Sequence, residues 1–257
     1  GTVECVIING VECEPYITSD YRLMMEHADE VIVGLQLLMK ALGVTKGYIG
    51  IEVNKPKAIS LLEQKVSGLD GVEVVPLKQA YPQGGEKQLI DAVMRRQVKS
   101  GGLPIDVGAV VQNVATALAV YDAVQKNKPL IDNSVTVTGE CFPRQANLLV
   151  RVGTPLNFII DHLGGMPADT AKVISGGPMM GKAIANLEAS TLKGTGALLF
   201  LTGEQTRRKP ESNCIRCGKC ADACPMGLEP YLLNRLYKAG DTDALEENAV
   251  QDCIQCG

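Results

Sequence analysis

The sequence predicts an α/β domain over about residues 1–130, a small α+β module over 131–205 and a helical, cysteine-rich region over 206–257. Three observations indicate this division. Short β-branched runs alternate with longer amphipathic stretches in the first half, which is typical of β/α units around a mainly parallel sheet. After Pro129 the segments become short and glycines interrupt them. Six of the nine cysteines follow residue 213.

The first domain contains one clearly amphipathic helix. Val31, Leu35, Leu38 and Leu42 recur at intervals of three and four, and Gly43 follows as a C-terminal cap. This pattern predicts a helix over residues 24–42. We expect further helices at residues 57–66, 86–99 and 114–126, and strands at 3–8, 47–53, 72–76 and 109–112.

The second module is predicted from shorter segments. Strands are expected at residues 133–138, 147–152, 172–175 and 198–202, and a helix at 156–163. A polar and basic linker over residues 204–212 then leads to the cysteines. Helices at 229–238 and 243–248 should pack around them.

Composition excludes some classes of function. The net charge is −4, there is no Trp, and there is no basic tract beyond residues 207–209, so no nucleic acid partner is expected. The longest apolar run, 31–39, is about half the length needed to cross a bilayer. No nucleophilic triad is recognisable, and no catalytic residue is assigned. His27 falls inside an expected helix, and Met179 and Met180 are interpreted as core and turn residues.

The cysteine region carries the most specific motif. Cys214, Cys217, Cys220 and Cys224, followed by Pro225, have the C-x2-C-x2-C-x3-C-P spacing of bacterial ferredoxins. Structural zinc sites usually pair two C-x2-C elements across a loop, and disulfides require an oxidising compartment. The spacing therefore favours an iron–sulfur cluster over both alternatives.

A second motif starts at Cys253 and Cys256. In two-cluster ferredoxins, the fourth cysteine of each motif ligates the other cluster. We therefore expect two 4Fe-4S clusters, the first held by Cys214, Cys217 and Cys220 and the second by Cys224, Cys253 and Cys256. Each cluster lacks one cysteine ligand within this chain, so the chain is interpreted as part of a longer protein. The lone Cys5, Cys13 and Cys141 are expected to be small buried hydrophobes.

Three loops that follow expected strands contain unusual polar residues: 9–15 (NGVECEP), 81–89 (YPQGGEKQL) and 112–116 (QNVAT). Ligands of open α/β sheets bind beyond the carboxyl ends of the strands, and free helix N–H groups can hold a phosphate. Singly, Asn9, Glu86 and Asn113 are more simply explained as caps and turn formers. Together, the three loops favour a binding site.

These loops resemble the flavin and NADH loops of the 51 kDa flavoprotein subunit of respiratory complex I. With the SGGPMMG turn at 175–181 and the ferredoxin motif, the chain is more similar still to the C subunits of the Rnf (Rsx) electron transport complexes. The resemblance covers essentially the whole chain. It implies a Rossmann-like FMN/NADH domain over 1–130, an SLBB-type β-grasp module over 131–205 and a ferredoxin-type domain over 206–257.

The resemblance also implies site residues. It places Asn9, Glu12 and Glu14 near the flavin or nicotinamide, Tyr81 and Glu86 beside the nucleotide, and Asn113 and Thr116 at the FMN phosphate or ribityl chain. The chain departs from the pattern in two ways. The family's glycine-rich loop, expected before the first strand, is absent, so truncation at both ends is expected. Gly85 and Ala115 also stand where complex I subunits carry glutamates.

The implied function is electron transfer from NADH through FMN to the clusters, and on to membrane subunits that couple it to ion transport. The implied enzyme is an NADH-linked, ion-translocating oxidoreductase, with ferredoxin as an indirect partner, and the chain alone is expected to be inactive. Its expected place is peripheral, on the cytoplasmic face of the bacterial inner membrane. Two alternatives stay open: a cobalamin reductase of the propanediol-utilisation type, and a flavin-free electron-wiring or docking module.

Overall fold

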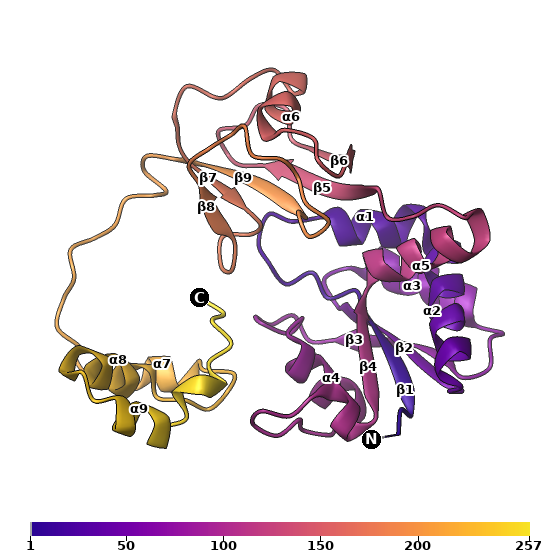
Figure 1. The fold of residues 1–257 in the computed structure, drawn as a ribbon, viewed down its shortest axis with the longest axis horizontal. Helices are drawn as coiled ribbons and strands as arrows, with labels where there is room; N and C mark the ends of the chain where they lie inside the picture. Colours follow the sequence, from indigo (N-terminus) through magenta and orange to yellow (C-terminus); the bar gives the residue numbers. More distant parts are fainter. Residues whose placement is uncertain (1) are drawn as a thin grey trace. The chain divides into compact units, whose positions relative to one another are not determined.

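A computed structural model describes residues 2–257, which form two compact units. The larger unit comprises the chain up to residue 98 and residues 102–206, and contains two separate β-sheets (Figure 1). The smaller unit comprises residues 99–101 and 207–257 and contains only helices and loops. The predicted fold class, with an α/β region followed by an α+β region and then a helical region, is therefore confirmed.

The first sheet is fully parallel, with strand order β3-β2-β1-β4. Its strands are β1 (Cys5–Asn9), β2 (Lys46–Glu52), β3 (Val72–Leu77) and β4 (Ala109–Asn113). From β1 the chain builds outward through β2 to β3, and then returns to place β4 on the other side of β1. Strand order therefore reverses between β1 and β4, and this reversal point is where open α/β sheets bind ligands.

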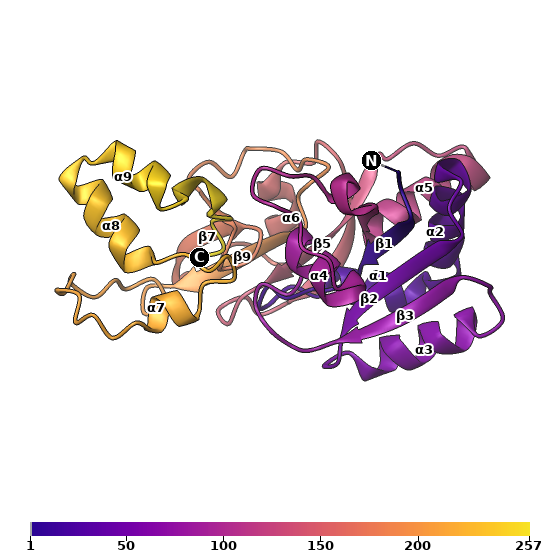
Figure 2. The ribbon, with the colours of Figure 1, turned by 90° about the horizontal axis from the view of Figure 1, so that it is seen from below.

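Helices cover both faces of this sheet (Figures 1 and 2). Val6 and Ile8 point to one face and pack with α1 (Ser19–Glu26), α2 (Ala28–Leu42), α3 (Pro56–Val66) and α5 (Val114–Lys126). Cys5 and Ile7 point to the other face, against α4 (Glu86–Met94). Since successive strand residues alternate between faces, burial on both sides requires the continuous apolar run of β1.

Two predicted helices have different bounds in the structure. The helix predicted over 24–42 is instead α1 and α2, which are separated by His27 with φ −128° and ψ 34°. His27 N–H still donates to Leu23 O at 2.8 Å, and Val31 N–H donates to His27 O at 3.0 Å. Because the backbone bonds and the apolar period both continue across the break, the pattern did not reveal it. The prediction that His27 lies inside a helix was wrong.

The helix predicted over 86–99 ends early, at Met94. Arg95 adopts a left-handed conformation with φ 57°, which terminates α4. The next residue, Arg96, donates to Val107 O at 2.9 Å and pairs with Glu4 at 2.9 Å. These contacts hold residue 96 beside the start of β1, and the short helix η1 (Pro104–Val107) then leads into β4.

The second sheet is mixed, with order β6-β5-β9-β7-β8. Its strands are β5 (Asp132–Thr138), β6 (Ala146–Arg151), β7 (Thr170–Ser175), β8 (Lys182–Ile184) and β9 (Ala197–Thr202). Helix α6 (Leu156–His162) packs on it, around the ring pair Phe142 and Phe200 at 4.5 Å. Strand β8 was not predicted, because three residues are too few to show a period.

The smaller unit contains α7 (Lys219–Asp222), α8 (Pro230–Ala239), α9 (Thr242–Glu247) and η2 (Val250–Asp252). The helices expected at 229–238 and 243–248 are confirmed, whereas α7 was not predicted. None of the residues in these four helices is buried. Domains of about this size usually need a metal or disulfides because their apolar cores are too small.

Among residues 2–257, no helix combines the length and the apolar character required to cross a membrane.

Candidate cofactor site at the carboxyl edge of the parallel sheet

The four parallel strands end at one edge, where the three polar loops begin. In register, Asn9 of β1 lies between Gly50 of β2 and Asn113 of β4. Gly10 follows at a crowded position, since a Cβ there would lie 2.7 Å from Met24 Sδ and 3.0 Å from Gly50 O. The edge therefore brings Asn9 and Asn113 together at the reversal point of the sheet.

Asn9 joins the first loop to the second. Its Nδ2 donates to Gly84 O at 2.9 Å, and its Oδ1 accepts from Val11 N–H at 3.0 Å. A Cβ on Gly84 would lie 2.6 Å from Val11 O, so only glycine permits this approach. The first and second loops are thus in direct contact, through residues 75 positions apart.

Glu12 lies buried under the start of α1. Its Oε1 accepts from Asp20 N–H at 2.9 Å and its Oε2 from Tyr21 N–H at 3.3 Å, so it satisfies N–H groups that α1 leaves free. Burial, followed by the nearby charge of Asp20, raises the pKa of Glu12 to about 7. The site therefore contains a carboxyl group that titrates near neutral pH.

Asn113 connects the third loop to the same network. Its Oδ1 accepts from Ala115 N–H at 2.7 Å, which makes it the N-cap of α5, and its Nδ2 donates to Asp20 Oδ2 at 2.8 Å. Burial raises the pKa of Asp20, and the bond from Asn113 opposes that shift. Asn113 is thus a helix cap, as the simpler interpretation held, and also a bridge between loops.

Three charged residues at this edge were missed by sequence reasoning: Asp20, Glu52 and Lys55. Glu52, the last residue of β2, is only 2% exposed, accepts weakly from Ala80 N–H at 3.4 Å, and has a pKa raised by burial. The charge of Lys55 counters the raised pKa values of Glu12, Asp20 and Glu52. A carboxylate that ends a continuous apolar strand is the signal that could have identified Glu52. Clusters of perturbed acids are typical of functional sites.

The other predicted cofactor residues occupy varied positions. Tyr81 is half-buried and precedes a cis bond to Pro82, whereas Glu86 is exposed at the start of α4. Thr116 is exposed in the first turn of α5. Glu14 points elsewhere: its carboxylate accepts from Met180 N–H at 2.8 Å and Met179 N–H at 3.1 Å, in the turn between β7 and β8. The prediction that Met179 and Met180 lie in a turn is confirmed, but they are not core residues, since their side chains are exposed.

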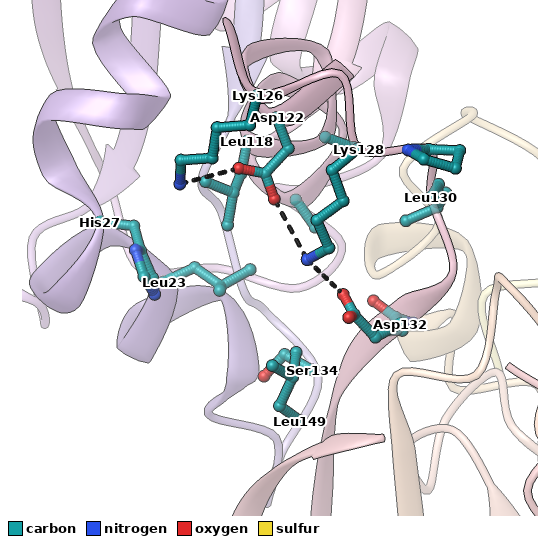
Figure 3. Close-up of a pocket in the computed structure, with 14 residues that line it drawn as sticks. Leu23, His27, Leu118, Asp122, Lys126, Lys128, Leu130, Asp132, Ser134 and Leu149 are labelled. Carbon is teal, nitrogen blue, oxygen red and sulfur yellow. Dashed lines mark hydrogen bonds and ion pairs between the residues drawn. The ribbon is translucent and has the colours of Figure 1, made fainter. Parts of the chain in front are cut away.

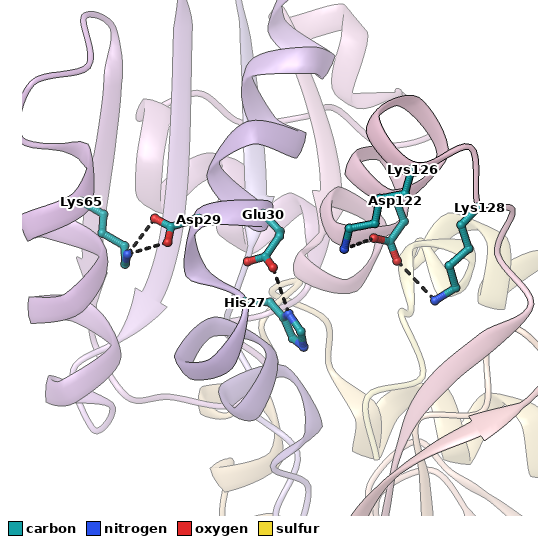
Figure 4. Close-up of polar contacts among 7 residues, drawn as sticks. All are labelled: His27, Asp29, Glu30, Lys65, Asp122, Lys126 and Lys128. Carbon is teal, nitrogen blue, oxygen red and sulfur yellow. Dashed lines mark hydrogen bonds and ion pairs between the residues drawn. The ribbon is translucent and has the colours of Figure 1, made fainter.

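A small cavity lies between α1, α5 and the start of the second sheet, and Ala115 of the third loop is one of its lining residues (Figure 3). Its volume of about 180 Å³ is small for a cofactor, and Leu23, Leu118 and Leu149 are among its lining residues. Lys126 and Lys128 both reach Asp122, at 3.1 and 3.4 Å, and Lys128 also reaches Asp132 at 2.9 Å (Figures 3 and 4). These pairs neutralise the lysines and join α5 to β5, which indicates a structural role.

The lysines determine how Asp122 titrates. Burial is the largest single influence on this carboxyl and raises its pKa, but the hydrogen bonds and charges of Lys126 and Lys128 together lower it. Two further pairs involve α2: Lys65 of α3 lies 2.7 Å from Asp29, and His27, between α1 and α2, lies 3.4 Å from Glu30 (Figure 4). All of these pairs are partly exposed, so each contributes little to stability.

The six motif cysteines lie in the smaller unit as thiols rather than disulfides. Cys214 Sγ accepts from Arg216 N–H at 3.4 Å, and Cys224 Sγ accepts from Leu228 N–H at 3.3 Å. Within residues 2–257, no three Cys, His, Asp or Glu side chains converge closely enough to hold a metal ion. The donor set nevertheless fits a soft metal cluster, because thiolates on a ferredoxin spacing are its ligands. Of the lone cysteines, Cys5 is buried as predicted, whereas Cys13 and Cys141 are only partly buried.

Family models match all three regions. The Nuo51 FMN-binding domain matches residues 1–122, the SLBB domain residues 134–183 and the 4Fe-4S binding domain residues 209–228. The fold also resembles that of NAD⁺-reducing [NiFe]-hydrogenase in its H2-reduced state, with a TM-score of 0.66, 18% identity and coverage of 79% of this chain and 41% of that one. The class of protein is thus a Nuo51-type FMN-binding domain followed by SLBB and 4Fe-4S segments.

Curated relatives identify the family. The chain is 48% identical over 245 residues to the C subunit of the proton-translocating ferredoxin:NAD(+) oxidoreductase complex of Clostridium ljungdahlii, covering 95% of this chain and 53% of the relative. It is 43% identical to the C subunit of the Na(+)-translocating ferredoxin:NAD(+) oxidoreductase complex of Acetobacterium woodii, covering 97% and 56%. The chain belongs to the family of these C subunits, which confirms the resemblance, and it spans about half the length of the curated relatives it matches.

Proposed function

We propose that this chain is the electron-transferring portion of a C subunit in an ion-translocating ferredoxin:NAD⁺ oxidoreductase, and that it passes electrons between NADH and 4Fe-4S clusters by way of FMN. The observation that carries the proposal is the linkage of three polar loops at the reversal point of a Nuo51-type sheet, through Asn9–Gly84, Glu12–Asp20 and Asp20–Asn113. FMN, when bound, accepts two electrons together and releases them one at a time.

The residues at the edge suit a flavin nucleotide. The start of α5 offers backbone N–H groups for a phosphate beyond that of Ala115, which the N-cap Asn113 already occupies, and Thr116 lies in the first turn. Asn9, Tyr81 and Glu86 lie on the two loops that Asn9 joins, where they would hold the flavin or the nicotinamide. Burial raises the pKa of Glu12 to about 7 and also raises the pKa values of Asp20 and Glu52, and a protonated carboxyl can donate a hydrogen bond as well as accept one.

The cysteine unit suits the clusters because it contains all six motif cysteines, and its helices contain no buried residue. We propose that Cys214, Cys217 and Cys220 hold one 4Fe-4S cluster and that Cys224, Cys253 and Cys256 hold a second, each completed by a cysteine outside this chain. N–H groups directed at sulfur, such as those of Arg216 and Leu228, raise cluster potentials. The domain boundaries proposed are 1–130, 131–205 and 206–257.

The proposal extends to the setting of the protein. The named relatives are subunits of ion-translocating complexes, so membrane subunits are the proposed partners, with ferredoxin an indirect one. We place the chain on the cytoplasmic face of the bacterial inner membrane, as a peripheral subunit. Ion transport is assigned to the other subunits.

An anaerobic NADH titration of the full gene product that contains this chain tests the function. Loss of flavin absorbance, followed by electron paramagnetic resonance signals of reduced clusters, is the expected result. Clusters that form but stay oxidised in a preparation without bound flavin would contradict it and favour the flavin-free wiring module. Reduction of cobalamin by the same preparation would instead favour the cobalamin reductase.

A further inference from the structure

Residues 14–18, which lead from the end of the first loop to α1, contact the second module through Glu14, Tyr16 and Thr18. Glu14 accepts from the backbone of Met179 and Met180, in the turn between β7 and β8. Tyr16 OH donates to Glu140 at 3.2 Å. Thr18 N–H donates to Thr136 Oγ1 of β5, also at 3.2 Å. Thr18 Oγ1 also accepts from Asn147 Nδ2 of β6 at 2.9 Å, so residues 14–18 connect the cofactor loop to strands and turns of the second module.

The Glu14 contact is the most specific of the three. Each carboxylate oxygen accepts one of two consecutive backbone N–H groups, Oε1 from Met180 and Oε2 from Met179. Consecutive N–H groups in a turn form a small anion-binding concavity, and bonds to a carboxylate are about twice as strong as neutral ones. The turn is thus shaped to receive a negative charge.

Gly177 makes room for this contact. A Cβ at residue 177 would lie 2.2 Å from Glu14 Oε2 and 2.4 Å from Glu14 Cδ. Such distances are far inside van der Waals contact, so any side chain at 177 would displace Glu14 or the turn. Gly177 of the SGGPMMG sequence at 175–181 is therefore required by a contact with Glu14, which belongs to the α/β domain.

The loop that Glu14 ends is the loop that builds the cofactor site. Two residues earlier, Glu12 caps α1 and so places Asp20, and at the start of the loop Asn9 contacts Gly84. The loop is consequently held on one side by the α/β domain and on the other by the second module. Movement of the β7–β8 turn would be transmitted to Glu14 and from there to the residues around the flavin.

We propose that Glu14 is a positioning residue, which clamps the β7–β8 turn to the loop after β1 and makes the geometry of the cofactor site depend on the second module. This inference rests on the proposed function for its consequence, but the clamp itself does not require a cofactor. It assigns Glu14 a role different from the direct flavin or nicotinamide contact implied by family resemblance.

Amide hydrogen exchange of the cofactor-free chain tests the clamp directly. In the wild type, the amides of Met179 and Met180 should be protected. Glu14→Gln should accelerate their exchange about tenfold or more, because an amide nitrogen would face one of the two N–H donors. Glu140→Gln is the matched control, since Glu140 accepts from the Tyr16 hydroxyl in the same region. Equal exchange of these two amides in wild type and Glu14→Gln would overturn the proposal.

A glycine pair provides an independent test that leaves Glu14 intact. Gly177→Ala should also accelerate exchange at Met179 and Met180, whereas Gly194→Ala should not, because a Cβ at residue 194 meets nothing within 4 Å. Unfolding curves establish that each variant is folded. Protection that persists in folded Gly177→Ala would contradict the clamp.

The effect on the site is measured in the full gene product as FMN affinity. Glu14→Gln and Gly177→Ala should both weaken FMN binding, by about tenfold if the clamp orders the loop, with the two control variants unchanged. If Glu14 acted only by touching the cofactor, Gly177→Ala would bind FMN normally. That result would refute the proposal that the second module controls the geometry of the cofactor site. Failure of every form to bind FMN would refute the proposed function, and the exchange experiment would then decide on the clamp by itself.

Discussion

The α/β domain and the cysteine unit differ in how much apolar surface their helices and strands bury. In the α/β domain, strands such as β1 are buried on both faces and covered by helices. In the smaller unit, the helices contain no buried residue, and Leu228, outside the helices, is buried. Apolar burial stabilises the first region, whereas the second has six cysteines, of which four are exposed, and helices without buried residues. A domain organised around a cluster need not show hydrophobic periodicity strong enough to fold by itself.

The largest expected effect comes from removing a cluster ligand. Cys220→Ala in the full gene product should abolish one cluster signal in electron paramagnetic resonance and remove hydrogen-exchange protection across residues 207–257. Protection in β1 and β2 should not change, because their core is apolar. Cys141→Ala, which alters a cysteine outside the motif, is the control. Retained protection throughout 207–257 would show that this unit does not depend on metal.

The second effect is a cavity in the α/β core. Leu35 is fully buried, and Leu35→Ala should lower the free energy of unfolding of the α/β domain by about 2–5 kcal/mol. Leu103→Ala should change it by less than about 0.5 kcal/mol, since Leu103, in the same domain, is 63% exposed. Denaturant unfolding followed by a probe in each unit measures both. A comparable loss in the two variants would mean that burial does not stabilise this domain.

The third effect is a pH dependence centred on Glu12. Its folded pKa of about 7 lies above the unfolded value of 4.5, so the folded state binds the proton more tightly. Stability should therefore fall as the pH rises from about 4.5 through 7, by on the order of 1–3 kcal/mol. Glu12→Gln should flatten part of this slope in unfolding measurements between pH 5 and 8. The pKa values of Asp20 and Glu52 are raised as well, so these two residues should account for the slope that remains in Glu12→Gln. An unchanged slope in Glu12→Gln would contradict the assignment.

The smallest effect separates the two roles of Asn113. Asn113→Ala removes the α5 cap and the bond to Asp20, and should cost about 1–2 kcal/mol. Asn113→Asp keeps an acceptor for Ala115 N–H but places a carboxylate beside Asp20. If capping dominates at high pH, Asn113→Asp will be more stable than Asn113→Ala. If the bridge to Asp20 dominates, it will be less stable. Thermal unfolding at pH 8 decides between them.

Sequence reasoning succeeded where the signal was local. The four strands of the first sheet were expected within a few residues, since each is a short β-branched run, and the loops after them were recognised from their amides, carboxylates and glycines. It failed at His27, where backbone bonding bridges the helix break, and at Arg95, where a left-handed residue ends α4. It also missed Asp20, Glu52 and Lys55, whose significance lies in the groups around them.

The sequence by itself determined the iron–sulfur motif, the α/β pattern and the family, because cysteine spacing, strand runs and loop composition are local properties of the chain. Only the tertiary structure decided which groups the polar side chains contact. Glu14 reaches the backbone of a turn 165 or more residues away, and Asn113 reaches Asp20 across 93 residues. The physical reason is that a carboxylate or an amide has the same composition whether it caps a helix, bridges two loops or binds a ligand. What it does depends on the donors that folding places around it.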